Sequence, residues 1–327
     1  MEQMNARLNR RTLIAASAAA VTSGALPGAF GQGTWPTKNI TVIVPFAPGG
    51  AGNGSVRILA EIIGPKIGQP LVVENRAGGG GIPGTQYVTN SNDDHMLLMG
   101  STSMTILPAL RNDLGFDVQR DLKPIGMISS QPVVFAVPVN SPIKSLDDLV
   151  ARAKTSEISA GNSGVGTLSH LTTELLNRKL GLKLLAVPYK GDAQLIPDLV
   201  GGTIQLAVMN LPVALPLIQD GRLRAVAVTS KKSVASLPGV KTLNTLGPEF
   251  VISGWAALFA GRNVPAAGVE RFATELRAAL QLESVQERFA GFGVTAEIAT
   301  PAQTRDYVAA EMARWADVVR SRGIKLE

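Results

Sequence analysis

Short apolar runs rich in Val, Ile and Leu alternate with amphipathic stretches from residue 39 almost to the C-terminus. The runs have the length and composition of buried parallel strands, and the stretches between them have a helical period. Strands are predicted at 40–46, 71–74, 96–100, 133–137, 158–160, 184–188, 204–209 and 223–228. Helices are predicted near 55–67, 145–155, 168–180, 192–200 and 212–220, with a helical tail over 265–290 and 301–323. This alternation is typical of an α/β fold.

Two of the apolar runs mark places where the chain crosses between lobes. The run VVFAVP lies within 131–138 after a polar turn, and the similar run AVAVTS at 225–230 leads into a Lys/Ser/Pro-rich loop. A chain that leaves one α/β lobe at the first run and returns at the second forms two lobes joined by two hinge strands, with a ligand cleft between them. We therefore predict lobe 1 from residues 32–132 and 229–327, and lobe 2 from residues 133–228.

The first thirty residues have the pattern of an export signal. Arginines precede an alanine-rich apolar run over 13–30 that ends in small residues, which predicts a secretory signal peptide of residues 1–31 cut near Gly31. The pair Arg10-Arg11 resembles a twin-arginine signal. A membrane anchor is the alternative, and Pro27 within a modest apolar run disfavours it.

With no cysteine, the chain has neither disulfides nor a lipoprotein anchor. A freely diffusing, monomeric periplasmic protein is expected.

The residue inventory excludes several kinds of site. The chain has no cysteine and two histidines, so a Cys/His or multi-His metal site is excluded, and no metal or cofactor is predicted. No run of Lys and Arg with interleaved aromatic residues is present, so nucleic acid is not expected as a partner. Removal of residues 1–31 takes away three Arg and one Glu and lowers the formal net charge from +6 to +4, a mildly basic balance that suits an anionic small ligand.

The sequence VPFAPGGAGNGSVR at 44–57 joins a predicted strand to a predicted helix through a dense run of glycines. Gly49 and Gly54 have the spacing of a phosphate-binding loop, but Ser55 stands where such a loop has its lysine. Without that lysine the loop lacks the charge that pairs with terminal phosphates. Backbone N–H donors at a helix N-terminus remain, and they favour a smaller anion such as a carboxylate.

A second loop, SGVGTLSH at 163–170, also leads from a predicted strand through glycines into a predicted helix. It belongs to the other predicted lobe. Two helix N-termini facing each other across the hinge would each offer N–H groups to one ligand. The alternative is that both loops are ordinary turns with good capping residues, namely Asn53, Ser163 and Thr167.

Two further motifs resemble catalytic or nucleotide-binding signatures. Residues 79–84 formally read G-x-G-x-x-G, but Pro83 interrupts the motif and no acidic residue ends the next strand, so a flexible loop is predicted. Residues 161–165 fall one glycine short of a nucleophile elbow because Val165 fills the last small position. His170 lies two turns along the same helix from Ser163, about 10 Å away. A serine hydrolase using Ser163 stays an alternative, and we predict that the protein is not an enzyme.

Several ordered segments carry a family resemblance that covers the mature chain. They are the opening at 35–50, VENR at 73–76, PYKG at 188–191, DLVGG at 198–202, NLP at 210–212, LRAVAVT at 223–229 and EMARWADVVRSRGIK at 311–325. In these segments the chain resembles the solute-binding proteins of tripartite tricarboxylate transporters, also called Bordetella uptake gene proteins. The resemblance implies a two-lobed, type II-like periplasmic-binding-protein fold. It also implies capture of a small carboxylate, either a di- or tricarboxylate or an aromatic one, and its delivery to a membrane permease. A ligand-sensing receptor subunit is the alternative.

The resemblance also implies which residues hold the ligand. They come from the two glycine loops and from neighbouring strand ends: Phe46, Ala47, Pro48, Gly49, Gly50, Asn53, Ser101, Thr102, Ser163, Gly164, Val165, Gly166, Thr167, His170, Met209 and Asn210. The family usually has Asp at the position of Asn53 and often at that of Met209. Fewer acids near the ligand favour a purely anionic or aromatic ligand over an amino acid, and Met209 offers an adaptable surface for a ring.

Two cations lie near the predicted loops. Arg57 stands four residues before Glu61, a spacing that favours an ion pair on the helix surface, so a structural role is predicted for it. Lys190 follows a predicted strand end, and a role in binding the ligand stays open for it.

Overall fold

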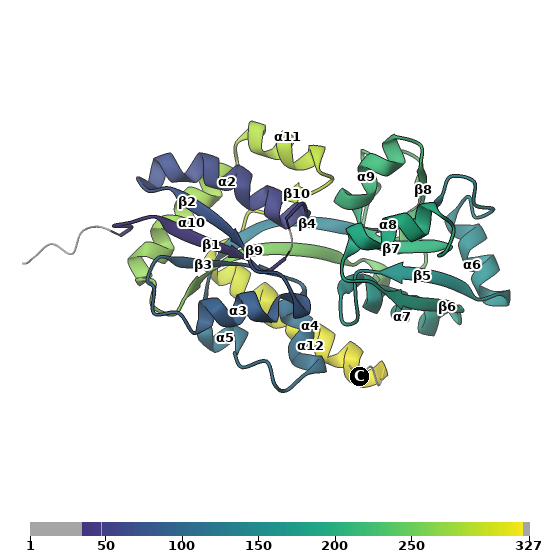
Figure 1. Cartoon of the computed structure of the whole chain (residues 1–327), viewed down its shortest axis with the longest axis horizontal. Helices are drawn as coiled ribbons and strands as arrows, with labels where there is room; N and C mark the ends of the chain where they lie inside the picture. Colours follow the sequence, from purple (N-terminus) through teal and green to yellow (C-terminus); the bar gives the residue numbers. More distant parts are fainter. Residues whose placement is uncertain (1–34, 47, 323–327) are drawn as a thin grey trace, which may run out of the picture. The chain divides into compact units, whose positions relative to one another are not determined.

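Ten strands form the sheet of this protein in a computed structural model that describes residues 35–46 and 48–322 (Figure 1). The predicted signal peptide and Ala47 lie outside the described residues. The strands lie in the order β2-β1-β3-β9-β4-β7-β5-β6, and β8 and β10 pair with β4. No helix among the described residues is long and apolar enough to cross a membrane.

The first part of the sheet combines parallel and antiparallel strands. The strand β1 (Ile40–Val44) pairs in parallel with β2 (Leu71–Asn75) and β3 (Met96–Ser101), while β9 (Ser253–Gly261) runs antiparallel to β3. The short strand β10 (Thr295–Ala296) is antiparallel to β4. The parallel arrangement brings the carboxyl ends of β1, β2 and β3 to one edge, where the first glycine loop begins.

The longest strand, β4 (Leu122–Pro138), runs through both parts of the sheet. Its first part, from Leu122 to Pro132, pairs with β9 through two shifts of register, and the remaining residues pair with β7 (Leu206–Asn210) and β8 (Leu223–Val228). The prediction of a strand at 133–137 was therefore too short. The predicted lobe boundaries near residues 132 and 228 stay predictions.

The second part of the sheet is covered on both faces. In it, β5 (Ile158–Asn162) pairs in parallel with β6 (Leu184–Pro188) and with β7. Along β4, Phe135 packs in the same apolar cluster as α6 (Leu146–Thr155) and α7 (Leu168–Leu180). Its neighbour Val134 packs with α8 (Asp192–Val200) and α9 (Leu211–Gln219). Alternate side chains of a strand point to opposite faces, so the apolar run here buries both of its faces.

The remaining helices surround the first part of the sheet and the connection back to it. They are α2 (Ala51–Ile67), α3 (Ile82–Thr89), α4 (Ser103–Leu110), α5 (Val118–Asp121), α10 (Ala266–Leu280), α11 (Glu283–Gly291) and α12 (Pro301–Arg322). Three short 3₁₀ turns also occur among the described residues, η1 (Gly79–Gly81), η2 (Leu243–Thr245) and η3 (Pro248–Phe250).

Two further sequence predictions of local structure were wrong. The glycine-rich segment 79–84 is not all loop, because α3 begins at Ile82 and Pro83 stands in its first turn, where the missing N–H costs nothing. The predicted helix over 265–290 is two helices, since α10 ends at Leu280 and α11 begins at Glu283.

Candidate functional site

The first glycine loop ends β1 and opens α2. Gly49 has a φ of +94°, a conformation that favours glycine, and Gly50 is the N-cap of α2 without a side-chain cap. Pro48 and Gly49 are exposed. The first turn of α2 contains no acidic residue, and the N–H groups of Gly52 and Asn53 have no partner among the described residues. The arrangement leaves backbone donors and the positive end of a helix dipole beside an exposed loop.

Asn53 belongs to a hydrogen-bonded network beneath this loop and does not cap the helix. Its side chain is 6% exposed and donates to Asn75 Oδ1 at 3.1 Å. Arg57 Nε donates to Asn53 Oδ1 at 3.0 Å, and Asn75 Nδ2 donates to the carbonyl oxygen of Phe46 at 2.9 Å. Asn75, the last residue of β2, therefore holds the start of the loop at Phe46. Asn53 Oδ1 and Nδ2 each have a hydrogen-bond partner within this network.

The predicted pairing of Arg57 with Glu61 was wrong. Arg57 donates to Asn53 and Asn75, whereas Glu61 pairs with Arg288 on α11 at 2.9 Å. The predicted structural role of Arg57 agrees with these contacts. Arg57 still has a partner four residues away on the helix, but that partner is the preceding Asn53 and not the following Glu61.

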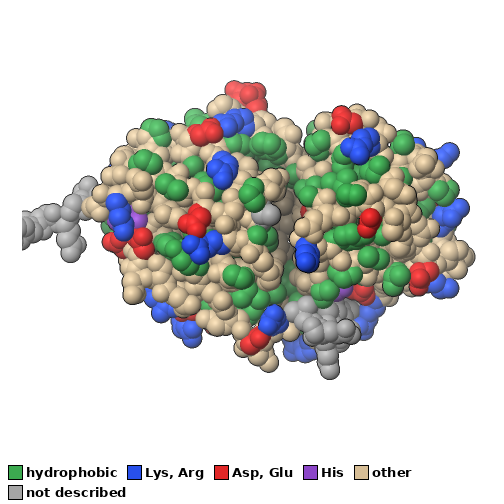
Figure 2. All heavy atoms as spheres, in the orientation of Figure 1, with side chains coloured by type: hydrophobic (Ala, Val, Ile, Leu, Met, Phe, Trp, Pro, Cys, Tyr) green, Lys and Arg blue, Asp and Glu red, His purple; other side chains and the backbone are tan. Residues whose placement is uncertain are grey.

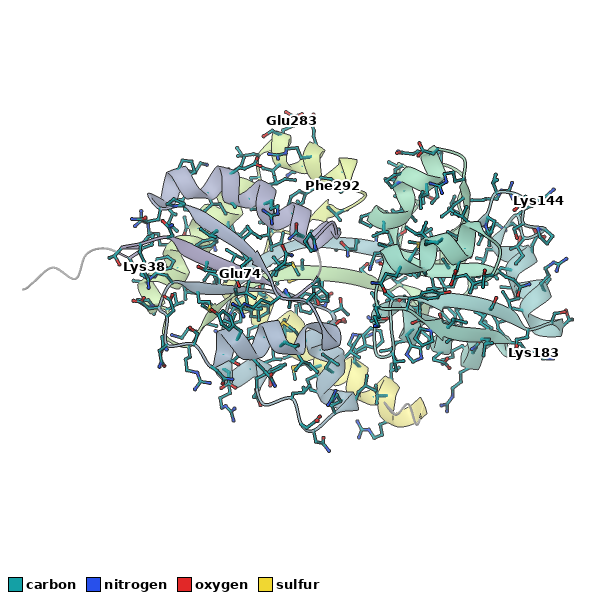
Figure 3. The ribbon with its side chains drawn as sticks, in the orientation of Figure 1. Lys38, Glu74, Lys144, Lys183, Glu283 and Phe292 are labelled. Atoms are coloured by element: carbon teal, nitrogen blue, oxygen red, sulfur yellow. The ribbon has the colours of Figure 1, made fainter. Side chains whose placement is uncertain are left out.

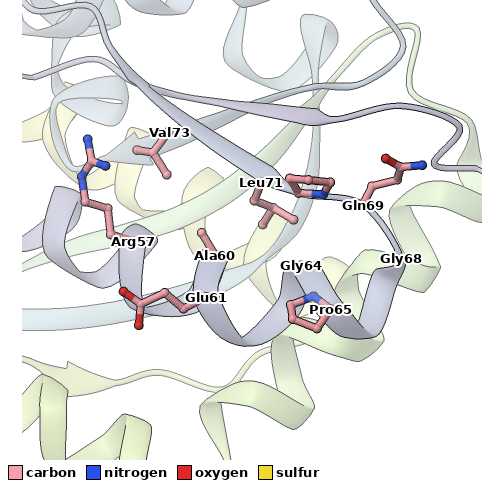
Figure 4. Close-up of a pocket in the computed structure, with 10 residues that line it drawn as sticks. Arg57, Ala60, Glu61, Gly64, Pro65, Gly68, Gln69, Leu71 and Val73 are labelled. Atoms are coloured by element: carbon pink, nitrogen blue, oxygen red, sulfur yellow. The ribbon is translucent and has the colours of Figure 1, made fainter.

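A groove of about 710 Å³ lies between α2 and β2 (Figure 4). Arg57 and Glu61 line it with apolar and small residues such as Val73 and Gly64, but no residue of the predicted glycine loops does. In this groove Glu61 is paired with Arg288, whereas Arg57 is hydrogen-bonded only to the neutral amides of Asn53 and Asn75 and keeps its positive charge.

Replacing Asn75 with alanine is expected to weaken binding of a carboxylate ligand about threefold to tenfold, since hydrogen bonds of this kind contribute about 0.5–1.5 kcal/mol. The physical reason is that the Phe46 carbonyl loses its anchor and the loop before α2 becomes less well ordered. Isothermal titration calorimetry measures the effect. Glu74, the preceding residue, pairs with Arg76 at the surface and is the matched control (Figure 3). Its alanine variant should bind as the wild type does, and an equal loss in both variants would contradict the anchoring role.

The second glycine loop, 163–170, is held by its own side chains. Gly164 and Gly166 have φ values of +126° and +77°. Thr167 caps α7, and its hydroxyl donates to the Gly164 carbonyl at 2.6 Å. The N–H groups of Ser163, Gly164 and Gly166 donate to side chains at the ends of the loop, namely Ser169 Oγ, Asn162 Oδ1 and His170 Nδ1. These three donors are thus not offered to a ligand, contrary to the simplest expectation from the glycine pattern.

Other donors of this second loop remain. The N–H groups of Val165, Leu168 and Ser169 have no partner within the described part of the chain. Val165 is exposed, and α7, like α2, has no acidic residue in its first turn. By contrast, α6 and α8 carry aspartates in theirs. The absence of acids at these two helix N-termini keeps their positive potential available to an anion.

The geometry does not assemble a hydrolytic site. The Ser163 hydroxyl is hydrogen-bonded to Ser169 at 2.7 Å, and His170 Nδ1 accepts a hydrogen bond from the Gly166 N–H at 3.3 Å. Burial lowers the pKa of His170, which fits a neutral ring with its proton on Nε2. No hydrogen bond joins Ser163 to His170 in the described residues, so Ser163 lacks a general base at this loop.

The four predicted strand-end residues have different surroundings. Ser101 ends β3, and the buried Thr102 hydroxyl accepts a hydrogen bond from the Trp255 N–H at 3.1 Å. Met209 is fully buried in the apolar cluster between the sheet and helices α8 and α9. Its predicted role as a surface for an aromatic ring was therefore wrong. Asn210 is the N-cap of α9, and Gln131 Nε2 of β4 lies 3.5 Å from its Oδ1.

Sequence reasoning missed Asp192, the first residue of α8. It is 9% exposed, and its Oδ2 accepts hydrogen bonds from Asn210 Nδ2 at 2.7 Å and from the Asn210 N–H at 3.2 Å. An Asp after a glycine at a helix start is a common first-turn residue, so nothing in the sequence distinguishes this one.

A group of possible metal ligands, Asp93, Asp94 and His95, lies elsewhere. His95 Nδ1 is 2.6 Å from Asp94, and His95 Nε2 accepts from the Thr37 N–H at 2.9 Å, so both ring nitrogens are engaged. Asp93 pairs with Lys38 at 3.0 Å (Figure 3). The contacts tie the segment before β1 to the start of β3, which is a structural use of these side chains.

The surface view shows acidic and basic side chains interspersed on this face (Figure 2). It also shows a furrow between the surface over α2 and α11 and the surface over α8 and α9 (Figure 2). At one point the two sides approach each other closely, because a Cβ on Gly293 after α11 would lie 3.3 Å from Leu211 of α9.

Comparisons with known proteins agree with this geometry. The chain is 35% identical to protein BugT of Bordetella pertussis over 326 residues, which cover 98% of this chain and 100% of that protein. A solved structure of an R. palustris protein with adipate has a TM-score of 0.83 and 30% identity, covering 89% of this chain and 99% of that one. MatC from Rhodopseudomonas palustris with bound malate has a TM-score of 0.78 and 26% identity, covering 87% and 100%.

These similarities confirm the predicted two-lobed α/β fold of the periplasmic-binding type, and the similar proteins are solute-binding receptors, not enzymes. The family model described as the tripartite tricarboxylate transporter family receptor matches residues 55–324. The chain therefore belongs to the receptor family of tripartite tricarboxylate transporters.

Proposed function

We propose that this protein captures a small di- or tricarboxylate in the periplasm and delivers it to the membrane permease of a tripartite transporter. The observation that carries the proposal is the pair of glycine loops that open α2 and α7, both with free backbone donors and neither with an acid in the first helical turn. The adipate and malate bound to two similar proteins are ligands of this chemical class. Family membership supports delivery to a permease.

One support for an aromatic ligand is lost, because Met209, the expected contact surface for a ring, is buried in the core. The proposal is therefore a di- or tricarboxylate. Asn53 Oδ1 accepts from Arg57 and Asn53 Nδ2 donates to Asn75, which leaves one of the two Nδ2 N–H groups for a ligand. Bridging of both loops by one ligand would supply contacts that exist only in the closed form, which is how a ligand stabilises closure.

A thermal-shift screen of the mature protein against about fifty carboxylates, adipate and malate among them, tests the proposal. A ligand at one hundred times its dissociation constant is expected to stabilise the folded protein by about 2.7 kcal/mol. Amino acids such as aspartate should give smaller shifts than simple dicarboxylates. If no carboxylate raises the melting temperature, capture of a carboxylate is excluded. A sensor subunit would show the same shifts but no transport when the permease genes are co-expressed.

A further inference from the structure

Arg57 carries a positive charge that is not paired with any acid among the described residues. Its guanidinium donates to two side-chain amide oxygens instead, from Nε to Asn53 Oδ1 at 3.0 Å and from Nη2 to Asn75 Oδ1 at 3.4 Å. A guanidinium stays protonated in a protein, and an amide oxygen is neutral. The two amides therefore hold the group in place without cancelling its charge.

The acids of the two elements that flank Arg57 are paired with other cations. On α2 the acid is Glu61, which pairs with Arg288 at 2.9 Å, and on β2 it is Glu74, which pairs with Arg76 at 2.7 Å. Figure 4 shows the guanidinium of Arg57 and the carboxylate of Glu61 pointing away from each other. The charge of Arg57 is thus left for a group outside this set of contacts.

The guanidinium lies beside the positive end of a helix. Asn53 is in the first turn of α2, and Arg57 reaches back along the helix to bond its side chain. A cation at a helix N-terminus is unfavourable, and acids are the usual residues there. Within residues 35–46 and 48–322, the N–H groups of Gly52 and Asn53 in the same turn have no partner. An anion at this turn would satisfy the donors and offset both positive charges.

The same contacts fix the distance between the charge and the first glycine loop. Asn75 accepts from Arg57 at its Oδ1, and its Nδ2 donates to the Phe46 carbonyl at the start of the loop. The guanidinium is therefore two hydrogen bonds away from the loop backbone. Charges this close interact through water at low salt, where the Debye length is about 30 Å, and less at physiological salt, where it is about 8 Å.

We propose that Arg57 is a specificity-determining residue, whose uncompensated charge beside the first glycine loop makes ligand affinity depend on the ligand's net charge. The inference rests on the proposed carboxylate-binding function. The charge acts through space and needs no direct contact with the ligand. Because a Coulomb energy is proportional to the ligand's charge, each further carboxylate gains from Arg57. A backbone N–H donor, in contrast, serves only the carboxylate that it touches.

The test uses three ligands that differ only in charge. Butyrate, glutarate and propane-1,2,3-tricarboxylate carry one, two and three carboxylates on the same propane chain. Calorimetry at about pH 8 and about 10 mM salt measures their affinities for the wild type and for Arg57→Gln. The variant should bind them about threefold, about tenfold and about thirtyfold more weakly, in that order. At about 150 mM salt these losses should shrink.

Two further variants separate charge from structure. Glutamine at position 57 can still donate to Asn53 Oδ1, so Arg57→Gln removes the charge and keeps a contact of the network. Arg57→Lys keeps the charge and loses the two-pronged geometry, and its affinities should stay within about twofold of the wild type. Arg152→Gln, at an exposed position of α6, changes the net charge equally and should leave all three affinities unchanged.

An equal fold loss for the three ligands in Arg57→Gln, or the same losses in Arg57→Lys, would assign Arg57 a purely structural role and overturn the inference. Matching losses in Arg152→Gln would overturn it too, since the net charge of the whole protein would then be the cause. A wild type that binds none of the three ligands also contradicts it. The proposed function fails only if, in addition, no carboxylate of the thermal-shift screen stabilises the protein.

Discussion

Replacing Gly164 with alanine should weaken carboxylate binding at least about thirtyfold, with a circular dichroism spectrum close to that of the wild type. At a φ of +126° a side chain is strained, and the new Cβ would lie 3.0 Å from the carbonyl oxygen of Tyr189. That carbonyl is backbone, and the Tyr189 N–H is itself fixed by the Asn162 carbonyl at 2.9 Å. The loop must move to relieve a strain of about 2 kcal/mol.

The loop at Gly164 has little freedom to move without losing its donors. Thr167 and Asn162 both bond to Gly164, one at its carbonyl and one at its N–H, so a shift of the glycine also disturbs the cap of α7. The affinity for the carboxylate that gives the strongest thermal shift is the quantity to measure.

Gly181 is a matched control, because it has a φ of +64° at the C-cap of the same helix, and its Cβ would meet nothing within 4 Å. Gly181→Ala should lose about 1 kcal/mol of stability and none of the affinity. Similar affinities for Gly164→Ala and the wild type would show that this loop does not hold the ligand.

Most of the strands predicted from the sequence contain a run of Val, Ile and Leu. The missed strand β9 reads SGWAALFAG, in which small residues replace the β-branched ones, so its propensity for a strand is weak. It is a strand because β3 and β4 lie on either side of it and bury its small side chains. The pairing of β9 with a strand on each side is a tertiary contact, and the local sequence pattern does not reveal it.

The first half of β4 was missed for a related reason. It contains Pro124, Gly126 and two serines, which in a single sequence indicate turns. In the sheet, the pairing with β9 shifts register between Pro124 and Gly126, and this irregularity accommodates the proline, which has no N–H to donate. The strand thus depends on its neighbour more than on its own composition.

In the candidate site, the glycine pattern located both loops but did not show which donors are free. At the second loop the side chains of Asn162, Ser169 and His170 use three backbone N–H groups, and only the folded geometry shows this. Likewise, Met209 has the sequence position of a strand-end ligand residue but points into the core between α8 and α9. Glycine density predicts a loop shape, whereas burial decides which atoms a ligand reaches.

Thr229 joins the two connections between the parts of the sheet, at the point where the chain leaves β8. Its fully buried hydroxyl accepts from the Val133 N–H on β4 at 2.9 Å and donates to the Ile252 carbonyl just before β9. Its backbone bonds the same two residues, through the Val133 carbonyl and the Ile252 N–H. One residue thus ties β4 to the segment that returns the chain to the first part of the sheet.

Thr229→Val is expected to lower the free energy of unfolding by about 3 kcal/mol, measured by urea denaturation of the mature protein. Valine keeps the shape and β-branching of threonine but leaves the Val133 N–H and one lone pair of the Ile252 carbonyl without partners. Each buried group left in this way costs about 1–3 kcal/mol. Valine and threonine side chains have the same number of heavy atoms, so the substitution leaves no cavity that would add to the loss.

Thr242 provides the comparison, because it is also buried and its backbone pairs with Val228, but its hydroxyl has no hydrogen bond among the described residues. Thr242→Val should change stability by less than about 0.5 kcal/mol. A small loss of stability in Thr229→Val would mean that the backbone hydrogen bonds alone hold β4 to the segment before β9. A large effect at both positions would point to an intolerance of valine in this segment. A loss at Thr229 alone would show that its hydroxyl holds β4 to the segment before β9.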